Sequence, residues 1–419
     1  MFRSNIARVL PGIAAATLGL LVMSALAASP TTTIGVSAPD CSYRDYPITV
    51  AVTASATAKS ATLTDAKSGQ TVACQLWRDG EKAMLTWIIP ELAKGASLSY
   101  KVAFSDVVAL FPETAGVILR QSDEAVEVAI SGALFTRYVI AGGPKPYCYP
   151  IIGPTGAQVT RDFPMKKLDA EANLKDQDHP HHRSLWFTHG DVNGVDFWSE
   201  SAKAGKTVHR AFEATESGIL MGRLRAVTDW MAPDAKKVCE DTREIRFYKV
   251  AQGRLFDWDI TIKATEGPVK FGDTKEGMFG FRVASTMKGD AKKFDPKIGG
   301  AILNSEGLKD GDAWGKPAKW VDYCGPVEGK TVGIAVFDHP SSFRHPTYWH
   351  VRTYGLYAAN PFGIHDFPGG KGKDGSHTIA QGDSISFHYR AFIHSGTTEE
   401  ANVAHVYEQF VKPPKVEVR

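Results

Sequence analysis

The chain has 419 residues, of which 43% are hydrophobic and 22% are charged. These values are ordinary for a globular protein and exclude wholesale disorder, and the length is enough for about two or three domains. The 48 basic and 46 acidic side chains give a net charge of +2. Because no basic stripe stands out among them, nucleic acid is excluded as a partner.

Residues 1–27 have the pattern of a cleavable signal peptide. Arg3 and Arg8 give a positive start, residues 12–23 are mostly apolar, and Ala25-Leu26-Ala27 is a small-x-small cleavage pattern. The alternative is a membrane anchor, but no later segment approaches the roughly 20 apolar residues of a spanning helix. We therefore predict a periplasmic or secreted protein with no membrane insertion after signal cleavage.

The remaining chain predicts a mainly β fold with few helices. Residues 28–112 contain short alternating runs, such as 48–53 and 83–89, separated by Gly or Asp turns, and predict a small β-sandwich. Residues 113–419 continue the alternation, as in 254–264 and 384–393, and predict a large antiparallel β-sandwich, supersandwich-like, since short strands joined by turns leave no room for crossover helices. The best helical pattern is 399–410.

Five cysteines follow the predicted cleavage site. In an oxidising compartment Cys41 and Cys74 form a plausible pair inside the first sandwich, and one disulfide or none is expected. No C-x-x-C occurs, so thiolate metal sites and redox motifs are not indicated.

The segment 178–198 is the first of three that carry candidate chemistry. If it is a strand, His179 and His181 share a face and suit either metal ligation or proton transfer, while His182 points the other way. Arg183 would bind a carboxylate or vicinal hydroxyls, and Trp186 and Trp198 offer faces on which sugar rings stack. The same segment adds three further candidates for substrate binding: His189, Asp191 and Asn193. The alternative is a structural cluster of bonded histidines and packed tryptophans.

The second segment is 338–363. On a strand that starts at Tyr348, the side chains of His350, Arg352 and Tyr354 would lie on one face and form a polar ledge for hydroxyls or an anion, with Trp349 beside it. The alternative is a structural Arg–carboxylate pair with a tyrosine corner, since ion-pair networks have the same appearance.

The third segment is 271–280. Glu276 follows Lys275 and precedes a glycine, and is the strongest candidate for a general acid or base, with Asp273 next. The alternative is a charged turn between strands. Four later residues favour a cleft position: Trp314, Trp320, Asp322 and Tyr323.

These motifs resemble a family of exported proteins common in bacteria that degrade complex polysaccharides, a family that carries a name borrowed from the methane mono-oxygenase subunit PmoA. The resemblance covers nearly all of the chain after the first sandwich. It rests on these runs: Lys145-Pro146-Tyr147, Gly153-Pro154, Arg161-Asp162-Phe163, Asp178 to Arg183, Trp186-Phe187, His189-Gly190, Asp273 to Gly277, Trp314-Gly315-Lys316, Trp320 to Tyr323 and Trp349 to Arg352.

The resemblance implies a large β-sandwich akin to the galactose mutarotase superfold, in which a His and a carboxylate move protons on a sugar. It does not imply a membrane methane oxygenase, because that subunit needs several spanning helices. The sequence departs from the family pattern at Ser184, where a glycine is expected.

Together these features favour an exported carbohydrate-active enzyme that cleaves a glycosidic bond by hydrolysis or elimination. Glu276 would be the acid or base, with His179, His181 or His350 as proton partner. The alternatives are a mutarotase-like epimerase or isomerase and a non-catalytic glycan-binding protein. The expected ligand is an oligosaccharide or polysaccharide, and all three readings require these distant segments to line one cavity.

No cofactor is indicated by a motif, since HExxH and similar spacings do not occur. A divalent metal ion is left open, and its ligands would be His179, His181 and His182. The sugar, the linkage, the stereochemical outcome and the oligomeric state do not follow from the sequence.

Overall fold

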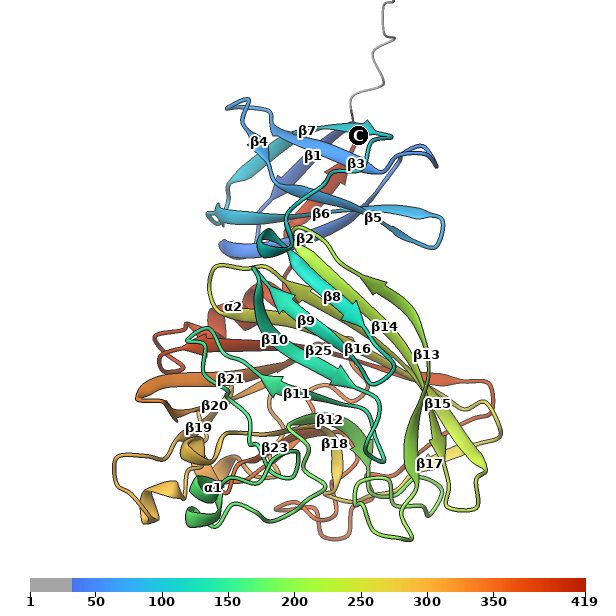
Figure 1. Ribbon diagram of the computed structural model, residues 1–419, viewed down its shortest axis with the longest axis vertical. Helices are drawn as coiled ribbons and strands as arrows, with labels where there is room; N and C mark the ends of the chain where they lie inside the picture. The colour runs from blue at the N-terminus through green and yellow to red at the C-terminus, as the bar shows by residue number, and fades with distance from the viewer. Residues whose placement is uncertain (1–31) are drawn as a thin grey trace, which may run out of the picture. The chain divides into compact units, whose positions relative to one another are not determined.

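The computed structural model describes residues 32–419, so the predicted signal peptide, 1–27, lies outside the described residues. The described chain is built almost wholly from antiparallel strands (Figure 1), which confirms the predicted mainly β class. Over residues 32–419, no helix combines the length and the apolar character needed to cross a membrane.

The first part of the chain forms two facing sheets (Figure 1). One has the strand order β26-β1-β7-β3-β4 and the other the order β2-β6-β5. Their bounds are β1 Thr32–Ser37, β2 Tyr43–Val52, β3 Ser60–Asp65, β4 Thr71–Val72, β5 Cys74–Asp79, β6 Lys82–Leu92, β7 Ser97–Ser105 and β26 Lys415–Val418. Ile34, Leu63, Leu85 and Trp87 are buried between the sheets, as expected for alternating strands that turn one face inward.

The C-terminal strand belongs to this first sandwich. β26 pairs antiparallel with β1, with Ile34 opposite Val418. The prediction assigned these last residues to the large domain, and that detail is corrected, because no short-range pattern shows which sheet edge a terminal strand will join. The predicted boundary between residues 112 and 113 stays a prediction.

The larger part consists of two eight-stranded antiparallel sheets. The front sheet has the order β22-β23-β18-β12-β11-β10-β9-β8 and the back sheet the order β13-β14-β15-β16-β25-β21-β20-β19. The front strands are β8 Val117–Gln121, β9 Ala125–Ile130, β10 Ala133–Val139, β11 Tyr147–Ile151, β12 Leu185–His189, β18 Gly277–Arg282, β22 Tyr348–Val351 and β23 Leu356–Asn360. The back strands are β13 Lys206–Glu216, β14 Met221–Met231, β15 Lys237–Tyr248, β16 Arg254–Lys263, β19 Ala301–Asn304, β20 Trp320–Val327, β21 Lys330–Asp338 and β25 Ser384–Ser395.

Aromatic side chains fill the space between the front and back sheets. Phe279 of β18 stacks on Tyr389 of β25 with ring centroids 4.8 Å apart, and Phe187 of β12 meets Trp230 of β14 at 6.2 Å. All four are buried. These contacts join the two inner faces into one hydrophobic core. The outer face of each sheet is therefore available to other contacts or to a ligand.

Helices are few and short, as predicted. The elements outside the sheets are α1 Asp169–Asn173, α2 Val403–Val411, the 3-10 turns η1 Glu113–Ala115, η2 Ser285–Met287, η3 Ala291–Lys293 and η4 Asp310–Ala313, and a two-stranded ribbon of β17 Val269–Phe271 and β24 His377–Ile379. The predicted helix 399–410 is observed as α2, which begins later, and its Val403 and Tyr407 pack on the outer face of the back sheet.

The suggested disulfide between Cys41 and Cys74 does not form, and all five cysteines are free thiols. The Cys74 thiol donates to the carbonyl of Ala61 at 3.2 Å, and Cys41 lies 3.9 Å from the carbonyl oxygen of Lys412. Each thiol is therefore satisfied by a different part of the backbone.

Candidate functional site

A cavity of about 500 Å³ lies against the outer face of the front sheet. Its lining comes from three segments that are far apart in the chain. The lining residues are His179, His181, His182, Gly190, Asp196, Trp198, Ser199, Lys275, Glu276, His350, Arg352 and Tyr354. The three predicted segments thus meet at one cavity, because β12, β18, β23 and β22 are successive neighbours in the sheet.

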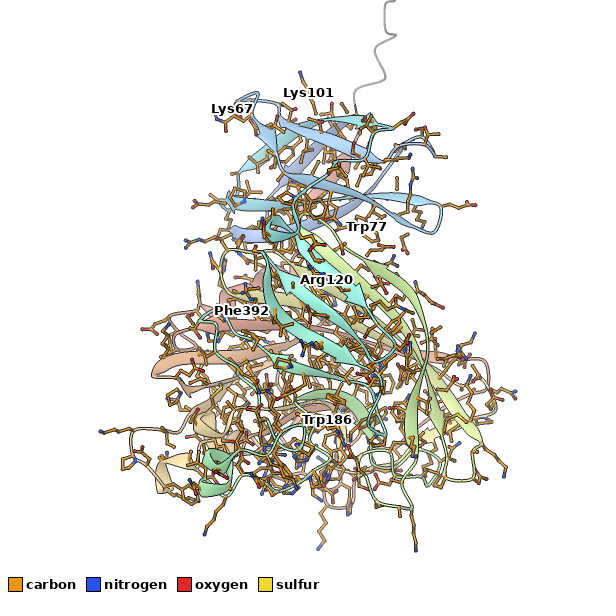
Figure 2. All side chains as sticks on the ribbon, viewed as in Figure 1. Lys67, Trp77, Lys101, Arg120, Trp186 and Phe392 are labelled. Atoms are coloured by element: carbon orange, nitrogen blue, oxygen red, sulfur yellow. The ribbon has the colours of Figure 1, made fainter. Side chains whose placement is uncertain are left out.

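The sheet register sets the layer of side chains that supports the cavity. One row across five strands reads Tyr147, Trp186, Gly280, Ala358 and His350. The middle of the row is small, so the indole of Trp186, labelled in Figure 2, lies across Gly280, where an added Cβ would come within 2.9 Å of the ring. His350 closes the opposite end of the row.

Asp178 and His179 form an oriented pair beside the cavity. The Nδ1 of His179 donates to Oδ2 of Asp178 at 2.7 Å, while Oδ1 of Asp178 accepts from Arg161 at 2.8 Å and Arg282 at 2.9 Å. Although burial acts in the opposite direction, the bond from His179 and the charges of Arg282 and Arg161 hold the pKa of Asp178 well below its usual range. The carboxylate therefore stays ionised, and in the neutral tautomer that donates Nδ1–H to it the lone pair of His179 is on Nε2.

The ring of His179 stacks on two other rings. It stacks on His182 with centroids 4.8 Å apart and on Tyr354 at 5.4 Å, and both pairs are nearly parallel. The backbone of His179 has a φ of 44°, so this stretch is a turn. The strand expected at 179–182 is wrong, and β12 begins only at Leu185.

His350 is oriented by an indole. Trp314 donates its Nε1–H to Nδ1 of His350 at 2.9 Å. Burial, with the nearby charges of Arg352 and Lys275, lowers the pKa of His350 to about 3, so the ring is neutral near pH 7. An indole N–H can only donate, so Nδ1 must be the acceptor and the proton of the neutral ring lies on Nε2. His350 is thereby fixed as a hydrogen-bond donor toward a ligand.

The other two cavity histidines are also neutral near pH 7. Burial and the charge of Lys145 lower the pKa of His181 to about 4. Burial and the charge of Arg282 lower the pKa of His182 well below its ordinary value, and Nδ1 of His182 lies 3.1 Å from the Arg282 guanidinium.

Glu276 and Lys275 project into the cavity together. Their charged ends are 3.4 Å apart, and about a third of the Glu276 side chain is exposed. The backbone of Glu276 is fixed by the N–H of Gly190, which donates to its carbonyl at 2.7 Å. An added Cβ at Gly190 would come within 2.8 Å of Cβ of Glu276, so the close approach requires glycine there.

Arg352 and Tyr354 lie in a turn after β22. The predicted strand through Tyr354 is wrong, because β22 ends at Val351 and Gly355, with a φ of 101°, turns the chain back into β23. Both side chains nevertheless line the cavity. The Arg352 guanidinium lies 4.9 Å from the ring of Trp314 and, within residues 32–419, forms no ion pair with a carboxylate.

Two tryptophans predicted to bind substrate are not accessible, namely Trp186, one of the two predicted sugar-stacking residues, and Trp349. Trp186 and Trp349 are both 0% exposed. Trp186 is covered by Trp198 and His182, and Trp349 donates Nε1–H to the carbonyl of Ala318 at 2.8 Å. Trp198 reaches the cavity lining but is only 2% exposed.

Two predicted polar residues instead stabilise loops behind the cavity. Arg183 forms a two-pronged ion pair with Glu200 at 2.6 and 2.7 Å and is outside the lining. Asp273, the second candidate for an acid or base, accepts from the backbone N–H of His365 at 2.9 and 3.0 Å. Charged groups in well-formed loops give the same sequence pattern as catalytic groups.

His189 is sealed inside the fold. It is 0% exposed, its Nε2 donates to the carbonyl of Gly272 at 2.8 Å, and its ring packs on Phe362. Burial lowers its pKa to about 4. It is outside the cavity lining, so direct substrate contact is ruled out in this conformation.

Asp191 and Asn193 shape the turn that follows β12. Asp191 accepts from the N–H of Gly194 at 2.9 Å, and the Asn193 amide bonds the backbone of Lys270 and Pro268. Neither lines the cavity.

The sequence reasoning assigned no role to several residues that build the site. Asp178 and Trp314 orient the two histidines, while Arg161 and Arg282 hold Asp178. Asp178, Trp314 and Arg161 stand in the runs that carry the family resemblance, and Asp178 directly precedes His179, which is the signal that could have found it. Asp196 and Ser199 also line the cavity, but Asp196 is used by the turn, where it accepts from the N–H groups of Trp198 and Ser199.

The histidine trio is not arranged as a metal site. Within the described range 32–419, one group of three has all its ligand atoms within 4.8 Å of one another, and that group is Asp322, Cys324 and His394. His179 and His182 stack face to face, and His181 meets them edge-on, so their nitrogens do not converge.

One protein family matches most of the chain. The model of a family described as "Family of unknown function (DUF6807)" matches residues 125–408. This match lends no support to the PmoA name. No curated protein matches the chain in sequence.

The chain is similar to several solved structures at low scores. A protein in the glycosyl hydrolase family 38 from Enterococcus faecalis has a TM-score of 0.46 and 9% identity over 93% of this chain and 47% of its own, so the chain spans about half its length. A galactose mutarotase-like protein from Clostridium acetobutylicum has a TM-score of 0.34 and 10% identity over 67% of this chain and 98% of its own. A glycoside hydrolase family 97 enzyme from Pseudoalteromonas sp. strain K8 has a TM-score of 0.27 and 9% identity over 67% and 34%. At these scores the superfold implied by the resemblance stays a prediction.

Proposed function

The chain belongs to the DUF6807 family, which has no assigned function, and we propose that it is an enzyme that acts on an acidic carbohydrate by acid–base catalysis. The proposal rests on one observation. Two imidazoles at the same cavity are locked in opposite roles, since Asp178 leaves His179 with a free acceptor nitrogen and Trp314 leaves His350 with a free N–H. A proton acceptor and a donor held in one cavity are the minimum requirement for moving protons on a bound sugar.

The cavity also fits the proposed substrate class. Its volume of about 500 Å³ is within the usual range for small-ligand sites. Lys275 and Arg352 supply two positive charges, and only Lys275 has a carboxylate partner, so an anionic group on the sugar would be attracted to Arg352. Glu276 and His181 are then free to bond hydroxyl groups.

Among the reactions open to such a site, we favour elimination. Nε2 of His179 takes the proton from the carbon next to the sugar carboxylate, while Arg352 and the N–H of His350 bind that carboxylate as negative charge builds on it. The electron pair forms a carbon–carbon double bond and the glycosidic C–O bond breaks. Tyr354, whose pKa is raised by burial and which is therefore neutral, gives its proton to the leaving oxygen.

Hydrolysis by the usual two-carboxylate mechanism is less well supported. Such hydrolases place two free carboxyl groups about 5–9.5 Å apart. Here Glu276 and Asp196 are the carboxylates of the lining, and Asp196 is already occupied by two backbone N–H groups. Mutarotase-like isomerisation remains the second candidate, because one acceptor and one donor suffice when no leaving group departs.

The test is product analysis on a panel of uronic-acid-containing oligosaccharides. Elimination would give unsaturated products with ultraviolet absorbance, isomerisation would leave the mass unchanged, and hydrolysis would give saturated reducing ends. Glu276→Gln and Tyr354→Phe should each lower turnover strongly with the fold intact. The matched control is Glu266→Gln, since Glu266 also faces a lysine, at 3.8 Å, but lies outside the cavity. Binding without turnover, or full activity in both variants, would remove the catalytic proposal.

Export to the periplasm or the medium is part of this proposal. A sugar-degrading enzyme with a cleavable leader would meet polymers outside the cytoplasm. Mass spectrometry of the mature N-terminus tests it: a chain that begins after Ala27 supports export, and an intact Met1 in the secreting host contradicts it.

A further inference from the structure

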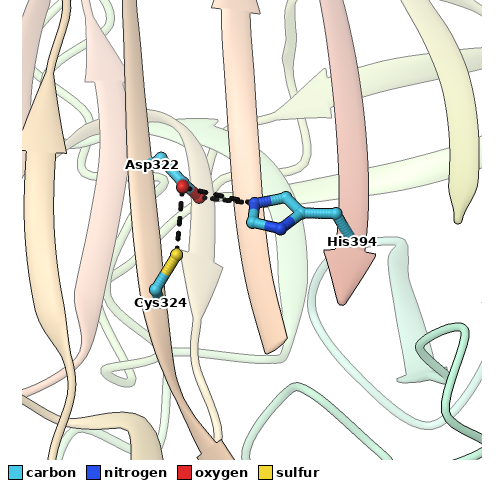
Figure 3. A group of neighbouring side chains, drawn as sticks. All are labelled: Asp322, Cys324 and His394. Carbon is cyan, nitrogen blue, oxygen red and sulfur yellow. Dashed lines mark hydrogen bonds and ion pairs between the residues drawn. The ribbon is translucent and has the colours of Figure 1, made fainter. Parts of the chain in front are cut away.

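A second polar cluster lies on the outer face of the back sheet, where Asp322, Cys324 and His394 meet across three strands (Figure 3). Asp322 and Cys324 are two residues apart on β20 and so share a face. His394 is on β25, and β21 runs between the two. In the register, Cys324 is opposite Gly333 and Gly333 is opposite His394, so both side chains converge over a glycine.

The glycine is what lets the three side chains meet. An added Cβ at Gly333 would lie 2.8 Å from Sγ of Cys324 and closer still to the imidazole of His394. In the next row Asp322 is opposite Ala335, another small residue. The sheet thus has a shallow hollow that is filled by three potential ligands rather than by a hydrophobic side chain.

The three ligand atoms already have the spacing of a coordination shell. Sγ of Cys324 is 3.0 Å from Oδ2 of Asp322, and Nε2 of His394 is 3.2 Å from both carboxylate oxygens. Tetrahedral zinc bonds of about 2.0–2.3 Å place ligand atoms roughly 3.3–3.5 Å apart. A small outward movement of each side chain would therefore admit an ion.

The orientation of the His394 ring also favours metal binding. Its Nδ1 lies 3.3 Å from the carbonyl oxygen of Ser395, an acceptor, so Nδ1 carries a proton. A metal-binding histidine typically donates its other N–H to a backbone carbonyl in just this way.

The carboxylate of Asp322 is paired with a histidine and not with an arginine or lysine. Asp322 is 0% exposed, and over residues 32–419 no Lys or Arg lies within 4.0 Å of its carboxylate. By contrast, Asp241 and Asp257 are paired with Arg243 and Arg390. A divalent ion would take the place of the hydrogen atoms through which His394 and Cys324 bond this carboxylate.

An ion can reach the cluster from outside. His394 also lines a cavity of about 490 Å³, together with Glu400 and Asn402 from the segment that leads into α2 and His405 of α2 itself. The hydroxyl of Thr398 lies 3.6 Å from Sγ of Cys324. A fourth ligand, either this hydroxyl or a water molecule, is therefore within reach.

We propose that Asp322, Cys324 and His394 bind one divalent metal ion, with zinc as the best fit to a thiolate, an imidazole and a carboxylate. On binding, the Cys324 thiol loses its proton to solvent, and Asp322 and the Nε2 lone pair of His394 complete the protein ligands. The ion ties β20 to β25 across β21. The site is on the opposite sheet from the carbohydrate cavity and is independent of the proposed activity.

The experiment is metal binding by the purified mature chain after treatment with a chelator. Added Zn²⁺ should bind with a stoichiometry of about one per chain and raise the melting temperature, and X-ray absorption should show one zinc–sulfur bond of about 2.3 Å. Co²⁺ should give a thiolate charge-transfer band. No bound zinc, or zinc without a sulfur ligand, would overturn the proposal.

Variants locate the ion. Cys324→Ser should remove the charge-transfer band and weaken zinc binding by about tenfold or more. Gly333→Ala should do the same while all three ligands are kept, because the new Cβ displaces them. The controls are Cys239→Ser, a buried thiol on β15 away from the cluster, and His181→Ala in the carbohydrate cavity. Both controls should bind zinc normally, and loss of zinc in His181→Ala alone would place the ion at the cavity and refute the assignment.

Discussion

One aspartate–histidine pair lies in the turn before β12 of the front sheet and another joins β20 to β25 of the back sheet, and the two pairs differ in what surrounds them. Asp178 is bonded by two arginines, and its partner His179 lies beside an open cavity. Asp322 is fully buried and, within residues 32–419, no Lys or Arg forms an ion pair with it; its partners are His394 and the thiol of Cys324. The first carboxylate therefore has cationic partners besides its histidine, whereas the second depends on its histidine and a thiol.

The difference shows how the environment of a carboxylate assigns the task of its histidine. Where arginines hold the carboxylate ionised, the histidine is needed only as a proton acceptor and is free to serve a substrate. Where they are missing, the histidine and the thiol are themselves the partners of the carboxylate, and the three groups together form a ligand set for a cation. The chemistry of each pair therefore follows from its neighbours and not from the pair itself.

The largest expected effect is a difference in kcat between variants of the two aspartate–histidine pairs. His179→Gln removes the acceptor nitrogen and should lower kcat by about 10²- to 10⁴-fold, the usual contribution of a general base. His394→Gln should leave kcat near that of the wild type. Steady-state kinetics on the substrate identified by product analysis measures both.

A matched control is His388→Gln. His388 bonds Asp259 at 2.7 Å and is about as exposed as His179, but it lies on the back sheet outside the cavity. It should keep full activity. Equal losses in the His179, His388 and His394 variants would mean that the pairs do not differ in function.

The second prediction concerns the cations behind Asp178. Arg282 is 0% exposed and bonds Asp176 and Asp178. Arg282→Met leaves two carboxylates without this partner and should lower the free energy of unfolding by about 3–5 kcal/mol. Denaturant unfolding at neutral pH measures it. Arg137→Met, at an exposed ion pair with Glu127, should cost under about 1 kcal/mol; equal losses would contradict the argument.

The sequence predicted the sheets better than the site. Alternating runs such as 254–264 were enough to predict β16, and the density of His and Trp marked the segments that line the cavity. Which of those residues face a ligand depended on the sheet register, which brings Trp186 beneath a covering layer and encloses His189. Asp322 and His394 are neighbours only because β20, β21 and β25 pair, and no local pattern carries that information.

The third prediction uses pH. His189 is fully buried, and burial lowers its pKa from 6.5 to about 4, so between these values the unfolded chain binds a proton that the folded chain does not. Its contribution to stability is present above about pH 6.5 and is lost as the pH falls toward 4, by about 3 kcal/mol in all. His189→Gln should flatten the fall in unfolding free energy over this window. An unchanged slope would show that His189 is not the group that titrates.

The smallest expected effect is at Ser184, just before β12 in the turn that carries His179. Its φ of 58° lies in the left-handed region, which fits the glycine expected there. Ser184→Gly relieves a backbone cost of about 1–2 kcal/mol but loses the bond between the hydroxyls of Ser184 and Thr160, at 2.8 Å, which contributes about 1 kcal/mol. Because these terms nearly cancel, Ser184→Gly should change the unfolding free energy by less than about 1 kcal/mol. Ser184→Ala keeps the backbone strain and also loses the hydrogen bond, so it should be the less stable of the two variants. Chemical denaturation ranks them, and the reverse order would show that the turn is not strained. Gly333, which lies beneath Cys324 and His394, differs from position 184, because any side chain at Gly333 is expected to displace these two residues.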